Sequence, residues 1–120
     1  MKLHTVIEAR RMIESLSATE GLNPHLAYWM AKFVMKTESD YSFYSEQVRG
    51  LLVKYKAEDR GGNYEIAKED VADFNDEFGK IGEIEVEDPG VRFSLSELSN
   101  ELRLSMKQIY PLMEFINEEE

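Results

Sequence analysis

The chain has 120 residues, 42% of them hydrophobic, which suits one domain with its own core. It contains no cysteine, and its formal net charge is −10. Disulfides, thiolate zinc sites and cysteine nucleophiles are therefore excluded, and direct nucleic-acid binding is not expected because that needs a basic face.

The negative charge lies almost entirely in the second half of the chain. Residues 1–57 contain eight Lys and Arg against six Asp and Glu, whereas residues 58–120 contain six against eighteen. The densest stretch, residues 58–88, has twelve acidic and three basic side chains. Because net charge governs association more than fold, this asymmetry points to the choice of partners.

The N-terminal segment does not resemble a signal peptide, since Glu8, Arg10 and Arg11 interrupt its apolar residues. No run in the chain approaches the roughly 18 apolar residues of a membrane span. We therefore expect a cytoplasmic protein without a membrane partner.

Residues 3–18 are predicted to form the first helix, ending near Glu20-Gly21. One face carries apolar side chains at helical spacing, namely Val6, Ala9, Ile13 and Leu16, with Leu3 and Met12 beside them.

A longer helix is predicted from Pro24 to about residue 57, antiparallel to the first. Asn23 suits the N-cap and Pro24 the first helical position. An apolar stripe then recurs every three or four residues, at Leu26, Met30, Phe33, Thr37, Tyr41, Tyr44, Val48, Leu51 and Tyr55. Such a helix would be about 50 Å long, so the first helix covers only half of it. A break at residues 37–40 stays open, because these residue types favour caps and turns.

The acidic half is predicted to mix helix and strand. After a loop at residues 60–63, Tyr64 and Ile66 suit a short strand. Lys68 to about Gly79 suits a third helix, with Val71, Phe74, Asn75 and Phe78 facing inward.

Residues 83–95 are predicted to form a β-hairpin. Ile84 and Val86 alternate with three glutamates, and Val91, Phe93 and Leu95 alternate with polar residues. Asp88-Pro89-Gly90 stands between the two runs and suits a longer or bulged connection.

Two capping motifs predict short C-terminal helices, one opened by Ser94 to Glu97 and one by Ser105 to Gln108. The last helix should kink at Pro111 and bury Met106, Ile109, Leu112 or Met113, and Ile116, before a frayed tail at residues 118–120. The expected fold is a helix-rich α+β single domain over residues 1–120, with a helical hairpin at 1–57 and an acidic α+β half at 58–120.

Nine carboxylates in this half are predicted to stand in fixed rows on one helix and one hairpin. They are Glu65, Glu69, Asp70, Asp73, Asp76, Glu77, Glu83, Glu85 and Glu87. Such rows complement a Lys- and Arg-lined groove of a nucleic-acid-binding enzyme, which makes them the candidate partner-binding face. The alternative is an acidic surface that only confers solubility.

Three aromatic residues, Tyr28, Trp29 and Phe43, lie off the main stripe and are candidate anchors for a protein partner. Core packing is the simpler alternative. A third is a platform for single-stranded nucleic acid, helped by a basic patch of Arg10, Arg11, Lys32 and Lys36.

No chemical motif points to catalysis. Glu69, Asp73, Asp76 and Glu77 share a helical face that suits a hard cation, but the spacing of a calcium-binding EF-hand loop is missing. His4 and His25 lie in no metal-ligand spacing, and no nucleophile elbow or phosphate loop occurs. We expect no catalytic residue, no metal site and no cofactor.

The order of elements resembles that of small phage and prophage proteins of uncharacterised function. The similarity covers about the last two-thirds of the chain and rests on loose patterns: Leu51-Leu52-x-Lys54-Tyr55, Glu58-Asp59 with Gly61-Gly62-Asn63, Phe74-x-x-Glu77, Ile84-Glu85-Val86, and Leu95-x-x-Leu98 followed by residues 105–114. This resemblance implies a phage or mobile-element origin and transfers no functional residue.

The leading hypothesis is a non-enzymatic phage-type protein that binds another protein. Its sharpest form is an inhibitor of a host defence enzyme such as a CRISPR nuclease, whose nucleic-acid groove the carboxylates would occupy. A role in virion assembly, through self-association or another phage protein, is the alternative. A metal protein or enzyme that uses the carboxylate cluster is the third.

Overall fold

The structure is a computed structural model that describes residues 1–117, and it confirms the helix-rich α+β class. The elements in chain order are α1 (Leu3–Ser17), α2 (Pro24–Lys36), α3 (Glu38–Lys54), β1 (Glu58–Arg60), β2 (Asn63–Glu65), the 3-10 helix η1 (Lys68–Asp70), α4 (Val71–Gly82), β3 (Phe93–Ser94), α5 (Leu95–Glu101), α6 (Met106–Ile109), the 3-10 helix η2 (Tyr110–Phe115) and β4 (Ile116–Asn117). The predicted tail at residues 118–120 lies outside the described residues.

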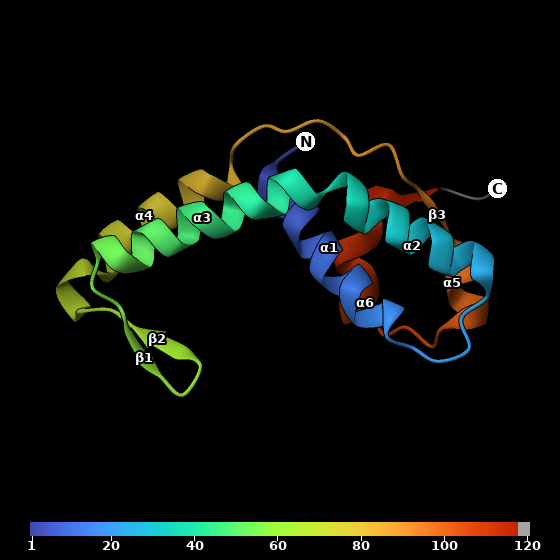
Figure 1. Cartoon of the computed structure of the whole chain (residues 1–120), viewed down its shortest axis with the longest axis horizontal. Helices are drawn as coiled ribbons and strands as arrows, with labels where there is room; N and C mark the ends of the chain where they lie inside the picture. The colour runs from blue at the N-terminus through green and yellow to red at the C-terminus, as the bar shows by residue number, and fades with distance from the viewer. Residues whose placement is uncertain (118–120) are drawn as a thin grey trace.

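The molecule is elongated, with extents of 49 × 31 × 23 Å. Its radius of gyration is 16.6 Å, against about 14 Å for a compact domain of this length. Figure 1 shows the reason: α3, α4 and the β1–β2 hairpin project from the remaining elements. We call residues 38–82 the arm, and residues 1–37 with 83–117 the body.

The body encloses most of the hydrophobic core. Phe33 of α2 lies at its centre, fully buried, with its ring edge-on to Phe115 at 4.9 Å between centroids. The predicted inner faces of α1 and α2 are confirmed, and the two helices form the expected hairpin. Asn23 caps α2 by accepting a 2.8 Å hydrogen bond from the amide of Leu26.

The predicted helix from Pro24 to residue 57 is two helices and not one, because the chain breaks at Thr37 between α2 and α3. The alternative of a break at residues 37–40 is confirmed. The buried Arg10 guanidinium lies at this break, where it donates to the Val34 carbonyl at 2.7 Å and pairs with Glu38 at 2.7 Å. At the break the Val34 carbonyl accepts hydrogen bonds from Arg10 and from the Thr37 hydroxyl in place of the amide that a continuous helix would supply. The apolar stripe nevertheless stays on one side of both helices.

The arm is a single layer of two helices. Rings of α4 meet rings of α3 edge-on, with Phe74 against Tyr55 at 5.8 Å and Phe78 against Tyr44 at 6.3 Å. Val71 and Asn75, predicted to face inward, are exposed. The prediction fails there because α3, together with α1 at the C-terminal end of α4, covers one side of this helix and leaves Val71 and Asn75 exposed.

The antiparallel hairpin lies earlier in the chain than predicted. β1 pairs with β2 from Glu58↔Glu65 to Arg60↔Asn63, so the predicted loop is a two-residue turn. Gly61 and Gly62 form it with φ of 66° and 96°, the positive values that a tight hairpin requires and glycine tolerates. The expected strand around Tyr64 is confirmed, although Ile66 falls outside it.

The hairpin predicted at residues 83–95 is wrong. Ile84 accepts a 2.8 Å hydrogen bond from the amide of Leu3, and Val86 donates one of 2.8 Å to the Met1 carbonyl. β3 pairs instead in parallel with β4. The alternation of apolar and polar residues correctly indicated extended backbone. It carries no information about which segment each strand pairs with, and in the fold residues 1–3 and β4 lie beside these segments. Residues 83–92 form a strap that returns from the arm to the body (Figure 1).

Both predicted C-terminal caps are confirmed, including the reciprocal box between Ser105 and Gln108. Pro111 ends the α-helix, and the chain continues as η2. Met106, predicted to be buried, is 85% exposed, whereas Phe115 is fully buried. Of the other predicted residues, Leu112 is fully buried as predicted, Met113 is exposed, and Ile109 and Ile116 are half-buried.

Candidate partner-binding surface of the arm

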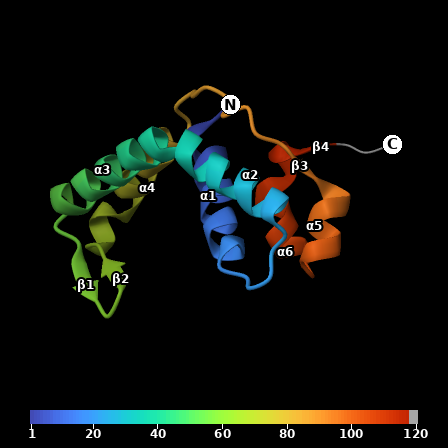
Figure 2. The same cartoon turned by 45° about the vertical axis from the view of Figure 1, so that its right-hand side comes forward.

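The nine predicted carboxylates fall into two groups in space. Six lie on the arm, from Glu65 on β2 to Glu77 on α4, and three lie on the strap, at Glu83, Glu85 and Glu87. Figure 2 shows the separation, with the hairpin at the far end of the arm and the strap beside the N-terminus. They therefore do not form one continuous face.

Two strap glutamates hold the N-terminus. Glu83 pairs with Lys2, and Glu85 pairs with the Met1 α-amino group at 2.9 Å. The hydrogen bond from that amino group lowers the pKa of Glu85. These side chains serve the fold, because they reinforce the backbone pairing between residues 1–3 and 84–86.

Glu87, the third strap carboxylate, borders a hollow of about 470 Å³ with Asp40 of α3. Burial raises the pKa of Asp40, and the nearby Glu87 charge adds to the effect. Asp88 lines the same hollow and pairs with Arg92, which lowers the pKa of Asp88.

Glu77 joins the two helices of the arm. It accepts a 2.7 Å hydrogen bond from Lys54 and another from the Tyr55 hydroxyl, both on the α3 side. The Lys54 bond, followed by that of Tyr55, lowers the pKa of Glu77. The same hydroxyl–carboxylate bond raises the pKa of Tyr55 to about 12. Glu77 thus stabilises the helix pair and is not available to a partner.

Two further arm carboxylates have local partners, Glu65 with Arg60 at 3.1 Å and Asp76 with Lys80 at 3.1 Å. Both pairs are exposed, so they are weak and exchangeable. Glu69, Asp70 and Asp73 make no hydrogen bond or ion pair with any side chain in residues 1–117. We call these three the free acidic triplet; it lies on η1 and the first turn of α4.

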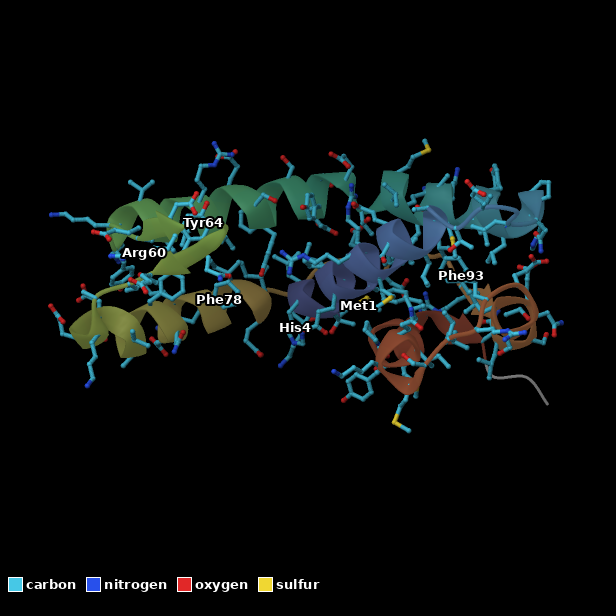
Figure 3. The ribbon with its side chains drawn as sticks, turned by 90° about the horizontal axis from the view of Figure 1, so that it is seen from below. Met1, His4, Arg60, Tyr64, Phe78 and Phe93 are labelled. Atoms are coloured by element: carbon cyan, nitrogen blue, oxygen red, sulfur yellow. The ribbon has the colours of Figure 1, made fainter. Side chains whose placement is uncertain are left out.

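The triplet also has a local structural role. Carboxylates in the first turn of a helix stabilise the positive end of its dipole, and Asp73 lies in the first turn of α4. Figure 3 shows the N-terminal end of α4 next to the β1–β2 hairpin, on which Arg60 and Tyr64 are labelled.

The three candidate aromatic anchors do not converge. Tyr28 is exposed on α2, Phe43 is exposed on α3, and Trp29 is half-buried against the body core. The Trp29 indole donates to His25 Nε2 at 3.2 Å, so the His25 proton sits on Nδ1, which faces Glu97 at 2.9 Å. Sequence reasoning missed this link between α2 and α5, since neither partner has a motif.

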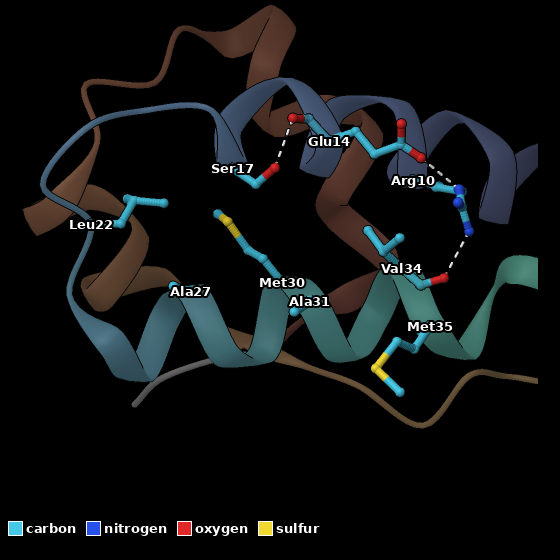
Figure 4. Close-up of a pocket in the computed structure, with 9 residues that line it drawn as sticks. All are labelled: Arg10, Glu14, Ser17, Leu22, Ala27, Met30, Ala31, Val34 and Met35. Atoms are coloured by element: carbon cyan, nitrogen blue, oxygen red, sulfur yellow. Dashed lines mark hydrogen bonds and ion pairs between the residues drawn. The ribbon is translucent and has the colours of Figure 1, made fainter.

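The predicted basic patch is not formed, because Arg10 is buried at the α2–α3 break. Figure 4 shows it at the end of a pocket of about 620 Å³ between α1 and α2, bonded to Glu14 and Val34. The rest of the pocket lining is mainly apolar, with Leu22, Met30 and Met35 among its residues. All the guanidinium nitrogens of Arg10 are engaged within the protein.

Within residues 1–117, no three His, Asp or Glu side chains are gathered closely enough to hold a metal ion. Glu69, Asp73, Asp76 and Glu77 therefore do not gather into such a cluster. None of the described helices combines the length and hydrophobicity needed to cross a bilayer. His4 contacts Glu8 only at 4.0 Å and packs against Gly82.

Comparison of the chain with protein-family models, with curated proteins and with solved structures finds no match in any of the three. The resemblance to small phage proteins therefore stays a prediction.

Proposed function

We propose that this is a non-enzymatic, phage-type protein that acts in the host cytoplasm by binding another protein through its arm. The observation that carries the proposal is the free acidic triplet, held on a helix pair that projects from the body. Most other carboxylates of the acidic stretch are paired within the protein, whereas these three are not. Fixed carboxylates without partners favour electrostatic association with a basic surface.

The sharper form of the proposal is inhibition of a host defence nuclease, such as a CRISPR nuclease. The triplet would occupy part of the Lys- and Arg-lined groove that otherwise holds nucleic acid, in the manner of a DNA mimic. The arm is suited to this because it projects from the body and carries eleven acidic side chains against six basic ones.

The test is a titration of purified CRISPR nucleases with the protein, with DNA cleavage as the readout at several salt concentrations. The double variant Glu69→Lys, Asp73→Lys should abolish inhibition. A matched control, Glu8→Lys with Glu20→Lys, changes the net charge equally on the body and should leave inhibition intact. Equal loss in both variants, or inhibition insensitive to salt, would contradict the acidic-mimic mechanism.

A second candidate is a structural role in virion assembly. Phe43 and Val53 favour it, because both are exposed on α3 at 45% and 73%. Sedimentation at several concentrations distinguishes the two: assembly through self-association requires a mass that rises with concentration, whereas the inhibitor acts as a monomer.

A further inference from the structure

One face of α4 is uncharged and uncovered. The helix presents Val71, Ala72, Asn75 and Gly79 beside the residues that contact α3. Phe78, which also contacts Tyr44 of α3, lies at the edge of this set, and all five residues are exposed. Their spacing places them on a single strip along the helix. We call this set the α4 strip.

The α4 strip offers a surface on which another helix could pack. Phe78 is 39% exposed, but its ring is held by stacking on Phe74 at 6.0 Å and by an edge contact with Tyr44. Nothing lies within 4 Å of a Cβ placed on Gly79, so a neighbouring backbone has room to approach there. The fixed Phe78 ring beside the open Gly79 therefore forms a preorganised apolar contact surface.

The charge around the strip decides between occupants. Asp76 borders the strip and pairs with Lys80, and the free acidic triplet lies at the N-terminal end of the same helix. Residues 68–82 together carry five acidic side chains against two lysines. A second copy of the chain would bring like charges together across a two-fold contact, which is unfavourable. A helix with an apolar stripe flanked by Lys or Arg can pack its apolar side chains on the strip and pair its charges with the acidic residues nearby.

We propose that the α4 strip seats a basic amphipathic helix of the partner protein. This inference rests on the proposed function, since the same partner would engage the free acidic triplet. It adds that recognition includes an apolar helix contact as well as charge.

The test uses synthetic peptides as probes. The first is an 18-residue fluorescein-labelled peptide of Leu and Lys, with Leu at helical spacing. A second replaces every Lys by Glu, and a third has the composition of the first with the Leu spacing scrambled. Fluorescence anisotropy measures binding, and amide chemical shifts of the protein locate it.

Gly79→Gln and Gly50→Gln form a matched pair. Both glycines are exposed helical positions with open space around them, and both changes raise helix propensity, so both variants should fold. Gly79→Gln places a side chain on the strip, whereas Gly50→Gln alters α3 in the same way. We expect the first peptide to bind, with shifts at residues 71–79, and Gly79→Gln to weaken it by about tenfold or more while Gly50→Gln does not.

Several results would overturn the helix seat. They are equal binding of the first and scrambled peptides, no binding of the first peptide, shifts outside α4, or self-association of the protein through the strip. Nuclease inhibition that survives Gly79→Gln but not Glu69→Lys, Asp73→Lys would remove the helix seat and leave the proposed function standing. Specific binding of the first peptide with no inhibition of any nuclease would support the helix seat and contradict nuclease inhibition.

Discussion

The body and the arm bury their phenylalanine side chains to different extents. Phe33 and Phe115 of the body are fully buried, with neighbours from α1, α2 and the C-terminal segment on every side. The central rings of the arm, Phe74 and Phe78, are half-buried or exposed, because α3 and α4 form one layer. From this difference we expect changes in the body to affect global stability more than changes in the arm, which keeps apolar and acidic surface accessible.

The largest expected effect is in the body. Phe33→Ala should lower the free energy of unfolding by about 3–5 kcal/mol, because it removes a fully buried ring and leaves a cavity. Urea denaturation measures the change. Val53→Ala, at an exposed arm position, should stay within about 0.5 kcal/mol. A Phe33→Ala effect as small as that of Val53→Ala would break the comparison.

The next effect is at the junction of the two regions. Arg10→Met should cost about 2–3 kcal/mol, because it leaves the carbonyl of Val34 without its charged donor. The neighbouring exposed Arg11 has only a cation–π contact with Tyr44 at 5.6 Å, so Arg11→Met should cost less than about 1 kcal/mol. Thermal unfolding compares the two, and similar costs would show that Arg10 does not hold the break.

A smaller effect is expected from Phe74→Ala, about 1–2 kcal/mol, because its ring is only half-buried. Hydrogen exchange should quicken at amides of α3 and α4 and remain unchanged around Phe33. Uniform quickening over the whole chain would instead mean that arm and body unfold as one unit.

The arm should also respond to pH through Glu77. Because the folded pKa of Glu77 is lowered, its stabilising effect is present above the ordinary value of 4.5 and is lost as pH falls through the folded pKa. Tyr55 behaves in the opposite sense, and its contribution is lost as pH rises from 10.0 through about 12. Glu77→Gln should remove the acid-induced rise in exchange of α4 amides, whereas Glu69→Gln should preserve it.

The smallest effect is at the tip of the arm. Gly62→Ala places a side chain at φ 96°, which costs about 1–2 kcal/mol within the hairpin alone. Nuclear magnetic resonance should show loss of the β1–β2 cross-strand contacts with no change in the unfolding midpoint. A lower midpoint would mean that the hairpin supports the helices.

Local signals in the sequence determined much of this protein. The caps at Asn23, Ser94 and Ser105 and the apolar stripe from Leu26 to Tyr55 were predictable, because each depends on residues within a few positions of one another. Extended backbone at residues 84–86 and 93–94 was predictable for the same reason.

Only the tertiary structure decided the rest. The residue types at 37–40 allowed a helix break, and the tertiary structure settled it at Thr37, where Arg10 from another helix bonds the Val34 carbonyl. It paired the strap with the N-terminus, because alternation does not name a partner strand. It also divided the carboxylates, committing Glu77 and Glu85 to internal partners and leaving Glu69, Asp70 and Asp73 free, since ion pairs depend on distances between elements that no local pattern encodes.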